Sequence, residues 1–154
     1  MAKPLDEIDM KLLNELQANS RITIRELSEK LHLSTTPIHE RIKKLEKGGY
    51  IKDYITLLNP KKFGKNLMVY ISVSLRDHTK SAIEEFETEV NKLNEVMECY
   101  YISGSSDYLL KVYCEDMDDF HNFITNKFSV ISNITQFYSS FVMYGTKVKY
   151  NFEL

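Results

Sequence analysis

A basic segment near the N-terminus carries the side chains best suited to chemistry with an anionic partner. Residues 34–47 (STTPIHERIKKLEK) place apolar side chains at helical spacing and polar or charged side chains between them. The polar residues are Thr35, Thr36, His39, Glu40, Arg41, Lys43, Lys44 and Lys47. Side chains near the start of such a helix can read base edges in a DNA major groove, while lysine and arginine beside them hold phosphates. The pattern also fits an ordinary amphipathic helix with a solvated charged face.

The residues around this segment predict the elements that position it. Thr23 is followed three residues later by Glu26, the pattern of a capping box, in which each side chain accepts an N–H at the helix start. Apolar residues then recur at helical spacing until His32-Leu33-Ser34 interrupts them. Pro37 suits the first turn of a second helix, and Gly48-Gly49 supplies the left-handed conformation that ends it. These two helices form a helix-turn-helix, a motif that places its second helix in DNA.

An apolar pattern at residues 5–18 predicts a further helix that closes a small core with these two. Residues 50–57 then alternate like a short extended ribbon, which would serve as a wing. Turn-forming residues at 59–65 mark a boundary. The sequence therefore predicts a DNA-binding domain at residues 1–60 and a second domain at residues 61–154.

The second domain changes from helical to alternating periodicity at Leu67, which predicts a strand. The expected elements are a strand at 67–75, a helix at 81–93, strands at 96–103 and 108–114, a helix from Asp116, a strand at 134–143 and a possible terminal strand at 147–152. Ser81 and Glu84 have the spacing of another capping box. The order is βαββαβ, so the fold class is α+β: a three-helix, winged helix-turn-helix domain followed by a ferredoxin-like domain.

In such a fold the two helices cover one face of the sheet, and the other face needs a cover of its own. Met68, Tyr70, Tyr101 and Phe141 are apolar residues that we expect on this second face. A second copy of the same sheet is the simplest cover, so the sequence predicts a homodimer.

The chain has a formal charge of −2, but its charge is unevenly distributed. Through Lys62 it holds 12 basic and 9 acidic residues, which gives this part +3 and leaves −5 for the remainder. A basic head on an acidic body turns the head toward an anionic polymer such as double-stranded DNA. An asymmetry of this size also arises by chance in a short chain.

No set of residues in the sequence points to catalysis or to a metal. None of the four histidines has a cysteine or aspartate partner at the spacing of a zinc site or a catalytic triad. We therefore expect no enzyme, no metal and no cofactor. Cys99 and Cys114 match no metal spacing and suggest a reducing cytoplasm, and no apolar run approaches the roughly 20 residues of a membrane helix.

Three segments carry a resemblance to a known family: LDEIDMKLL in the first helix, LS followed by ERIKKLEKGGYI in the helix-turn-helix, and SGSSDYLLKV in the second domain. In this order they resemble the Lrp/AsnC (leucine-responsive, feast–famine) transcription regulators over essentially the whole chain. The resemblance implies a sequence-specific DNA-binding regulator on the nucleoid. It also implies an amino-acid-sensing body, the RAM domain, that forms homodimers and assembles further, often to octamers.

The same resemblance implies an amino-acid effector held near the loop after the second strand and near the fourth strand. Carried over residue by residue, this site consists of Ser103, Gly104, Asp107 and Ser139. Backbone N–H groups around Gly104 would bind the carboxylate of the amino acid, and Asp107 its ammonium. Glycine and aspartate at these positions also fit a plain hairpin turn. Ser105-Ser106 replaces the bulkier pair typical of the family, which leaves the effector's identity open.

Two alternatives to an amino-acid-responsive regulator share these features. An architectural protein that wraps DNA without an effector would have the same head and body, and titration with amino acids separates it. The second alternative is a ligand-binding module whose head no longer reads DNA. Genomic footprinting distinguishes it from a DNA-binding regulator.

Overall fold

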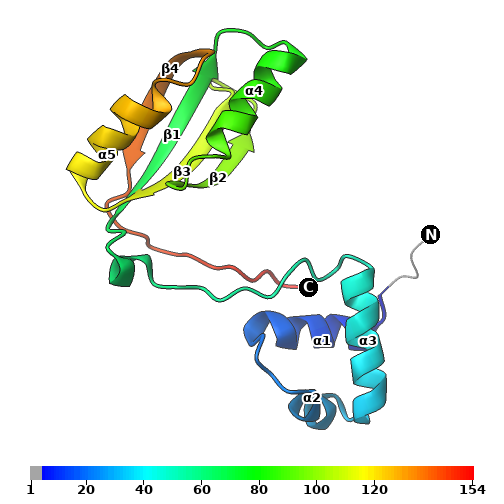
Figure 1. The fold of residues 1–154 in the computed structure, drawn as a ribbon. Coiled ribbons are helices and arrows are strands. Elements are labelled where there is room, and N and C mark those ends of the chain that lie inside the picture. The colour runs from blue at the N-terminus through cyan, green and yellow to red at the C-terminus, as the bar shows by residue number, and fades with distance from the viewer. Residues whose placement is uncertain (1–4) are drawn as a thin grey trace. The chain divides into compact units, whose positions relative to one another are not determined.

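The computed structural model describes residues 5–154, which form two compact units (Figure 1). The first unit runs to Leu57 and takes in Lys147–Leu154, and the second is Leu58–Thr146. The sequence predicts that the C-terminal residues belong to the second domain. In the structure they group with the N-terminal unit, because main-chain groups of Phe152 are hydrogen-bonded to the Gln17 side chain.

Three helices make up most of the first unit: α1 (Glu7–Ala18), α2 (Ile24–Leu31) and α3 (Thr35–Lys47). Local capping fixes their starts. Asp6 and Asp9 form a capping box at α1, so this helix begins later than the apolar pattern at residue 5 predicts. The predicted box of Thr23 and Glu26 at α2 is confirmed. At α3 the N-cap is Ser34, whose side chain makes no capping hydrogen bond.

The core of this unit joins all three helices. Its buried side chains are Leu12, Leu13, Leu27, Ile38 and Leu45. Full burial of a leucine or isoleucine side chain contributes about 1.5–3 kcal/mol, so burying these side chains stabilises the packing of the three helices. One face of α3 is therefore fixed against α1 and α2, and its opposite face is left to solvent.

Two glycines end α3 in the predicted way. Gly48 is the C-cap residue in a right-handed conformation, and Gly49 follows with φ of +73°. The segment that follows differs from the prediction, since residues 51–59 are assigned to no strand and the expected ribbon pairs with no strand among residues 5–154. The same holds for the terminal strand expected at residues 147–152.

The second unit has the predicted βαββαβ order. After a short 3-10 turn, η1 (Pro60–Phe63), its elements are β1 (Leu67–Leu75), α4 (Lys80–Val90), β2 (Val96–Tyr101), β3 (Tyr108–Cys114), α5 (Met117–Phe123) with a π-helical extension η2 (Ile124–Phe128), and β4 (Ile134–Phe141). The strands form one antiparallel sheet in the order β2-β3-β1-β4. This is the ferredoxin-like arrangement, and α4 and α5 lie over one face of the sheet (Figure 1).

The predicted capping box of Ser81 and Glu84 is wrong. Helix α4 begins one residue earlier, with Thr79 as the N-cap residue. The Asp77 carboxylate accepts the backbone N–H of Thr79 at 2.9 Å, which organises the turn before the helix and sets the earlier start. At the other helix, Asp116 caps α5 as predicted by accepting two backbone N–H groups.

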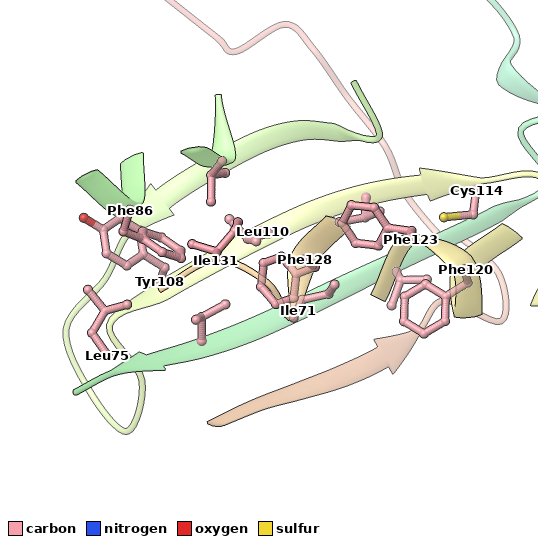
Figure 2. Close-up of a cluster of buried hydrophobic side chains, with 14 residues drawn as sticks. Ile71, Leu75, Phe86, Tyr108, Leu110, Cys114, Phe120, Phe123, Phe128 and Ile131 are labelled. Carbon is pink, nitrogen blue, oxygen red and sulfur yellow. The ribbon is translucent and has the colours of Figure 1, made fainter. Parts of the chain in front are cut away.

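Alternation along β1 and β3 places one set of side chains against the helices (Figure 2). Aromatic rings from α4, α5 and η2 pack on this layer; the Phe86 and Tyr108 centroids are 4.7 Å apart. The buried members are Val69, Ile71, Val73, Leu75, Phe86, Val90, Tyr108, Leu110, Val112, Cys114, Phe120, Phe123, Phe128 and Ile131. This cluster forms the core between the sheet and the two helices that cover it.

The opposite face of the sheet, here called the open face, carries Met68 and Tyr70 as predicted, because they alternate with the buried residues of β1. The placement of Tyr101 and Phe141 on that face is wrong. Tyr101 is aligned with buried Tyr108, and their ring centroids are 5.1 Å apart. Phe141 is aligned with Val69, and its ring lies 5.1 Å from that of Phe120 on α5. Both therefore lie on the helix-covered side.

Candidate nucleic-acid interface and ligand-binding loop

The outward face of α3 carries most of the residues predicted to contact DNA. The predicted contacts that are exposed on this helix are Thr35, Thr36, His39, Glu40, Lys43, Lys44 and Lys47, while Ile38 and Leu45 are buried. The hydroxyl and imidazole groups lie in the first two turns, and the lysines lie toward the C-terminal end. This order matches a helix that reads bases near its N-terminus and holds phosphates along its flank.

Arg41 is placed differently from the other predicted contacts. Its Nη1 donates to Asp6 Oδ2 at 2.7 Å and to Asp9 Oδ1 at 2.5 Å, so the guanidinium is used within the unit. Asp9 is only 1% exposed, and Lys44 Nζ lies 3.7 Å from its second oxygen. The hydrogen bonds that Arg41 donates to Asp6 and Asp9 raise the pKa of its guanidinium. Arg41 therefore ties α3 to the start of α1 and leaves the exposed lysines to meet an anion.

The turn between α2 and α3 is set by a left-handed residue and a side-chain hydrogen bond. His32 ends α2 with φ of +52°, and the Leu33 N–H donates to Ser28 O at 3.1 Å. The Ser28 hydroxyl donates back to the Leu33 carbonyl. This reciprocal pair fixes the angle at which α3 leaves α2, so the exposed face of α3 is presented in one orientation.

In the second unit, the loop between β2 and β3 contains the predicted effector residues Ser103, Gly104 and Asp107. Ser103 and Gly104 are exposed, and Gly104 has φ of +131°, which strongly favours glycine. The Ile102 N–H donates to Asp107 O at 2.8 Å and closes the hairpin. The tip of this loop, at Ser103 and Gly104, therefore lies at the surface of the unit.

The Asp107 carboxylate bonds to the end of β1 and the segment after it. One oxygen accepts the Leu75 N–H at 2.7 Å, and the other lies 2.9 Å from His78 Nε2. The Leu75 N–H, and then His78, hold the pKa of Asp107 below its ordinary value. Asp107 thus joins the β2–β3 loop to residues 75–78.

The structure does not bring Ser139 to this site. Ser139 is aligned with Ile71, whose side chain is buried on the helix side of β1. Leu75, which holds Asp107, lies four residues farther along β1, about 13 Å away at the ordinary rise of a strand. Instead the structure supplies His78, which the sequence analysis did not assign. His78 and Asp107 are 29 residues apart and share no motif, so no sequence signal joins them.

Residues 5–154 show no group of three or more histidine, cysteine, aspartate or glutamate side chains arranged to hold a metal ion. Across the same residues, no helix combines the length and apolar character needed to cross a membrane.

Two family models match the chain. One, described as winged helix-turn-helix DNA-binding, matches residues 5–52, and the other, described as the Lrp/AsnC ligand binding domain, matches residues 68–152. The boundary between them falls where the structure passes from the three-helix unit to the sheet unit, and the second model extends into the C-terminal residues that group with the first unit.

Similar proteins are transcription regulators. The leucine-responsive regulatory protein of Escherichia coli K12 is 42% identical over 122 residues, which are 79% of this chain and 74% of that protein. A transcriptional regulator from Neisseria meningitidis, solved as an L-Met complex, is 36% identical with a TM-score of 0.91, covering 98% of this chain and 96% of that one. An AsnC family regulator from Agrobacterium tumefaciens is 32% identical with a TM-score of 0.90, covering 96% of each chain.

These matches cover both units, and they agree with the exposed polar face of α3 and with the βαββαβ sheet. The chain therefore belongs to the Lrp/AsnC family of DNA-binding transcription regulators.

Proposed function

We propose that this protein is an amino-acid-responsive regulator that binds DNA through the outward face of α3 and acts as a dimer-based oligomer on the nucleoid. The observation that carries the proposal is this face: a helix with a buried stripe, held by a fixed turn, exposes hydroxyl, imidazole and lysine groups together. The matched regions supply the two functions, DNA binding at the head and ligand binding at the body.

On DNA, residues in the first turns of α3 are proposed to face base edges, and later residues to hold phosphates. The base-facing set is Thr35, Thr36, His39 and Glu40, and the phosphate-facing set is Lys43, Lys44 and Lys47. Arg41 contributes by holding the helix in place. We expect Thr36→Ala and His39→Ala to change the preferred sequence selected from a random DNA pool. Retention of the wild-type preference in both variants would remove the base-reading assignment.

The proposed effector is an amino acid, supported by the ligand-binding match and by the Neisseria regulator that was solved with L-Met. The loop tip at Ser103 and Gly104 would bind the carboxylate through backbone N–H groups. The ammonium would bind the Asp107 oxygen that now lies against His78, which is 54% exposed and free to move aside. Ser139 is left out of this site because of its position on β4.

Calorimetric titration with each of the twenty amino acids, beginning with L-methionine, tests the effector proposal. We expect heat from one or a few of them in the wild type and a large loss of affinity in Asp107→Asn. Asp118→Asn, a charge-matched change at an exposed position of α5, should bind normally. Equal affinities for the two variants would remove Asp107 from the site.

One observation favours a second function, an architectural DNA-wrapping protein without an effector. Both Asp107 oxygens already have donors, in Leu75 and His78, so the loop is complete without a ligand. This function predicts no heat with any amino acid and DNA compaction that is independent of all of them. Atomic force microscopy of long DNA, with and without amino acids, measures that compaction.

The open face of the sheet is the proposed homodimer surface. It carries Met68, Tyr70, Leu109 and Tyr113 around an ion pair between Lys111 and Glu98 at 2.8 Å. The other face is covered by α4 and α5, so a second copy of the open face would bury the remaining apolar side chains. Further assembly, to octamers as in many family members, is measured by light scattering at several concentrations.

A further inference from the structure

The C-terminal segment, residues 150–154, is bound to the helix-turn-helix unit by its main chain. The Gln17 amide, near the end of α1, donates from Nε2 to Phe152 O at 3.2 Å, and its Oε1 accepts the Phe152 N–H at 3.2 Å. One side chain thus satisfies both polar groups of one residue, in the manner of a neighbouring strand. The two residues are 135 positions apart, so the contact is tertiary.

A groove of about 840 Å³ surrounds this contact. Its floor is the end of α1, including Leu13 and Leu16, and one wall is the extended segment after α3. The other wall is the C-terminal segment, through Tyr150, Phe152 and Leu154. All of these residues belong to one compact unit. The groove is therefore a feature of the DNA-binding head itself.

The C-terminal segment lines one side of the groove and does not fill it. Tyr150 is 67% exposed and Phe152 is 71% exposed, so the rings contribute little burial. The net stabilisation from two neutral hydrogen bonds is small compared with the entropy lost when several residues are ordered. The C-terminal segment is held mainly by the hydrogen bonds of Phe152 and buries little surface, so it is readily released from the head.

We propose that the head binds the chain's own C-terminal segment through Gln17, along one side of this groove. The chain leaves the head after Leu57, and it returns to the head at Lys147 after β4. Docking of the segment thus gives the sheet domain a second attachment to the DNA-binding unit. Resting on the proposed function, we infer that effector binding to the body changes DNA affinity through this second attachment.

Chemical cross-linking tests whether the segment docks on its own head. The double variant Ala18→Cys/Phe152→Cys, which keeps Gln17 and pairs two residues that line the groove, is treated with a short bifunctional thiol reagent, with the wild type controlling for Cys99 and Cys114. We expect an internally cross-linked monomer on a denaturing gel, and no covalent dimer when the two single variants are mixed. A covalent dimer, or no more cross-linking than in Asn14→Cys/Phe152→Cys, would overturn the proposal.

Hydrogen–deuterium exchange tests whether Gln17 holds the main chain of Phe152, and it needs no cross-linking reagent. The Phe152 N–H should be protected in the wild type and lose its protection in Gln17→Leu, while Asn14→Leu on the same helix leaves it protected. Phe152→Pro, which lacks this N–H, should release the segment, while Asn151→Pro retains it. Equal exchange in Gln17→Leu and the wild type would overturn the capture.

The functional step is tested by deleting residues 147–154 from the full chain. We expect the deletion to keep DNA binding and the heat of amino-acid binding, but to reduce the effector-induced change in DNA affinity at least threefold. An unchanged effector response would overturn the coupling. Loss of amino-acid heat in the wild type itself would instead count against the proposed function, so the two failures are distinguishable.

Discussion

Arg41 of α3 and Asp9 of α1 form a hydrogen-bonded ion pair, with 2.5 Å between Nη1 and Oδ1. The carboxylate is buried while the guanidinium is about a quarter exposed. A buried carboxylate without its partner is strongly unfavourable, so the pair fixes how the DNA-facing helix lies on α1. Its importance is structural, although the sequence pattern places Arg41 among the DNA contacts.

Arg41→Met should therefore destabilise the head by about 2–4 kcal/mol, because Asp9 is left buried with only Lys44 nearby. Urea unfolding followed by circular dichroism measures this loss. The double variant Asp9→Leu/Arg41→Met removes both charges and should lose less than the single variant. A double variant less stable than Arg41→Met would contradict the buried-charge explanation.

The salt dependence of DNA binding separates phosphate contacts from structural cations. Lys43→Ala/Lys44→Ala should weaken binding to all sequences and reduce the slope of log K against log salt by about 2, since each lost phosphate contact removes about 0.9. Fluorescence anisotropy at several salt concentrations gives the slope. Lys92 lies just after α4, in the second unit, so Lys92→Ala is the control and should leave the slope unchanged. Arg41→Met should also keep the wild-type slope, measured where the variant is folded.

The left-handed conformation of Gly49 predicts a cost that depends on the backbone alone. A Cβ at this residue would meet nothing within 4 Å, so Gly49→Ala should lose about 1–2 kcal/mol from φ of +73° and not from a clash. Gly49→Asn should lose less, because asparagine tolerates this conformation better. Thermal unfolding of both variants provides the comparison, and equal losses would contradict the explanation.

The stability conferred by Asp107 should be lost in acid. The Leu75 N–H and His78 keep its pKa below the ordinary value of 3.8, so the ionised form stabilises the fold. This contribution is fully present above pH 3.8 and disappears as the pH falls through the lower folded-state pKa. Thermal unfolding should show Asp107→Asn less stable than the wild type at about pH 6, with the difference shrinking below pH 4. A difference that grows in acid would contradict this sign.

Charge on the open face should change the assembly and leave the fold intact. Leu109→Asp on β3 would place a carboxylate in the proposed dimer surface, where it would be desolvated without a partner. We expect a shift to a smaller species in light scattering, with a normal circular dichroism spectrum. Val130→Asp, at an exposed apolar position after η2, should keep the wild-type mass. An unchanged mass for Leu109→Asp would place the dimer surface elsewhere.

Features with local causes were predictable from the sequence. The capping box of Thr23 and Glu26 and the left-handed Gly49 depend on neighbours within a few residues, and both are confirmed. The Ser81 box failed for an equally local reason, since Asp77 and Thr79 organise an earlier start. The two candidate helix starts, at Thr79 and Ser81, lie two residues apart, so the spacing of residues alone does not decide between them.

Features set by partners distant in sequence were not predictable. The face occupied by Tyr101 depends on its alignment with Tyr108, after an irregularity in the register between Val96 and Glu98. Arg41 and Asp9 are 32 residues apart, and the helical pattern of α3 gives no sign of that pairing. Pairings of this kind are fixed only when the fold brings the elements together.

The grouping of Lys147–Leu154 with the first unit also bears on protein engineering. A head excised at Leu57 for fusion to a foreign sensor would leave behind the peptide that hydrogen-bonds to Gln17. A transplant that keeps the natural architecture has to insert the new sensor between Leu57 and Lys147, with both chain ends retained. In this protein the DNA-binding unit is encoded in two separate stretches, and the sheet unit lies between them in the sequence.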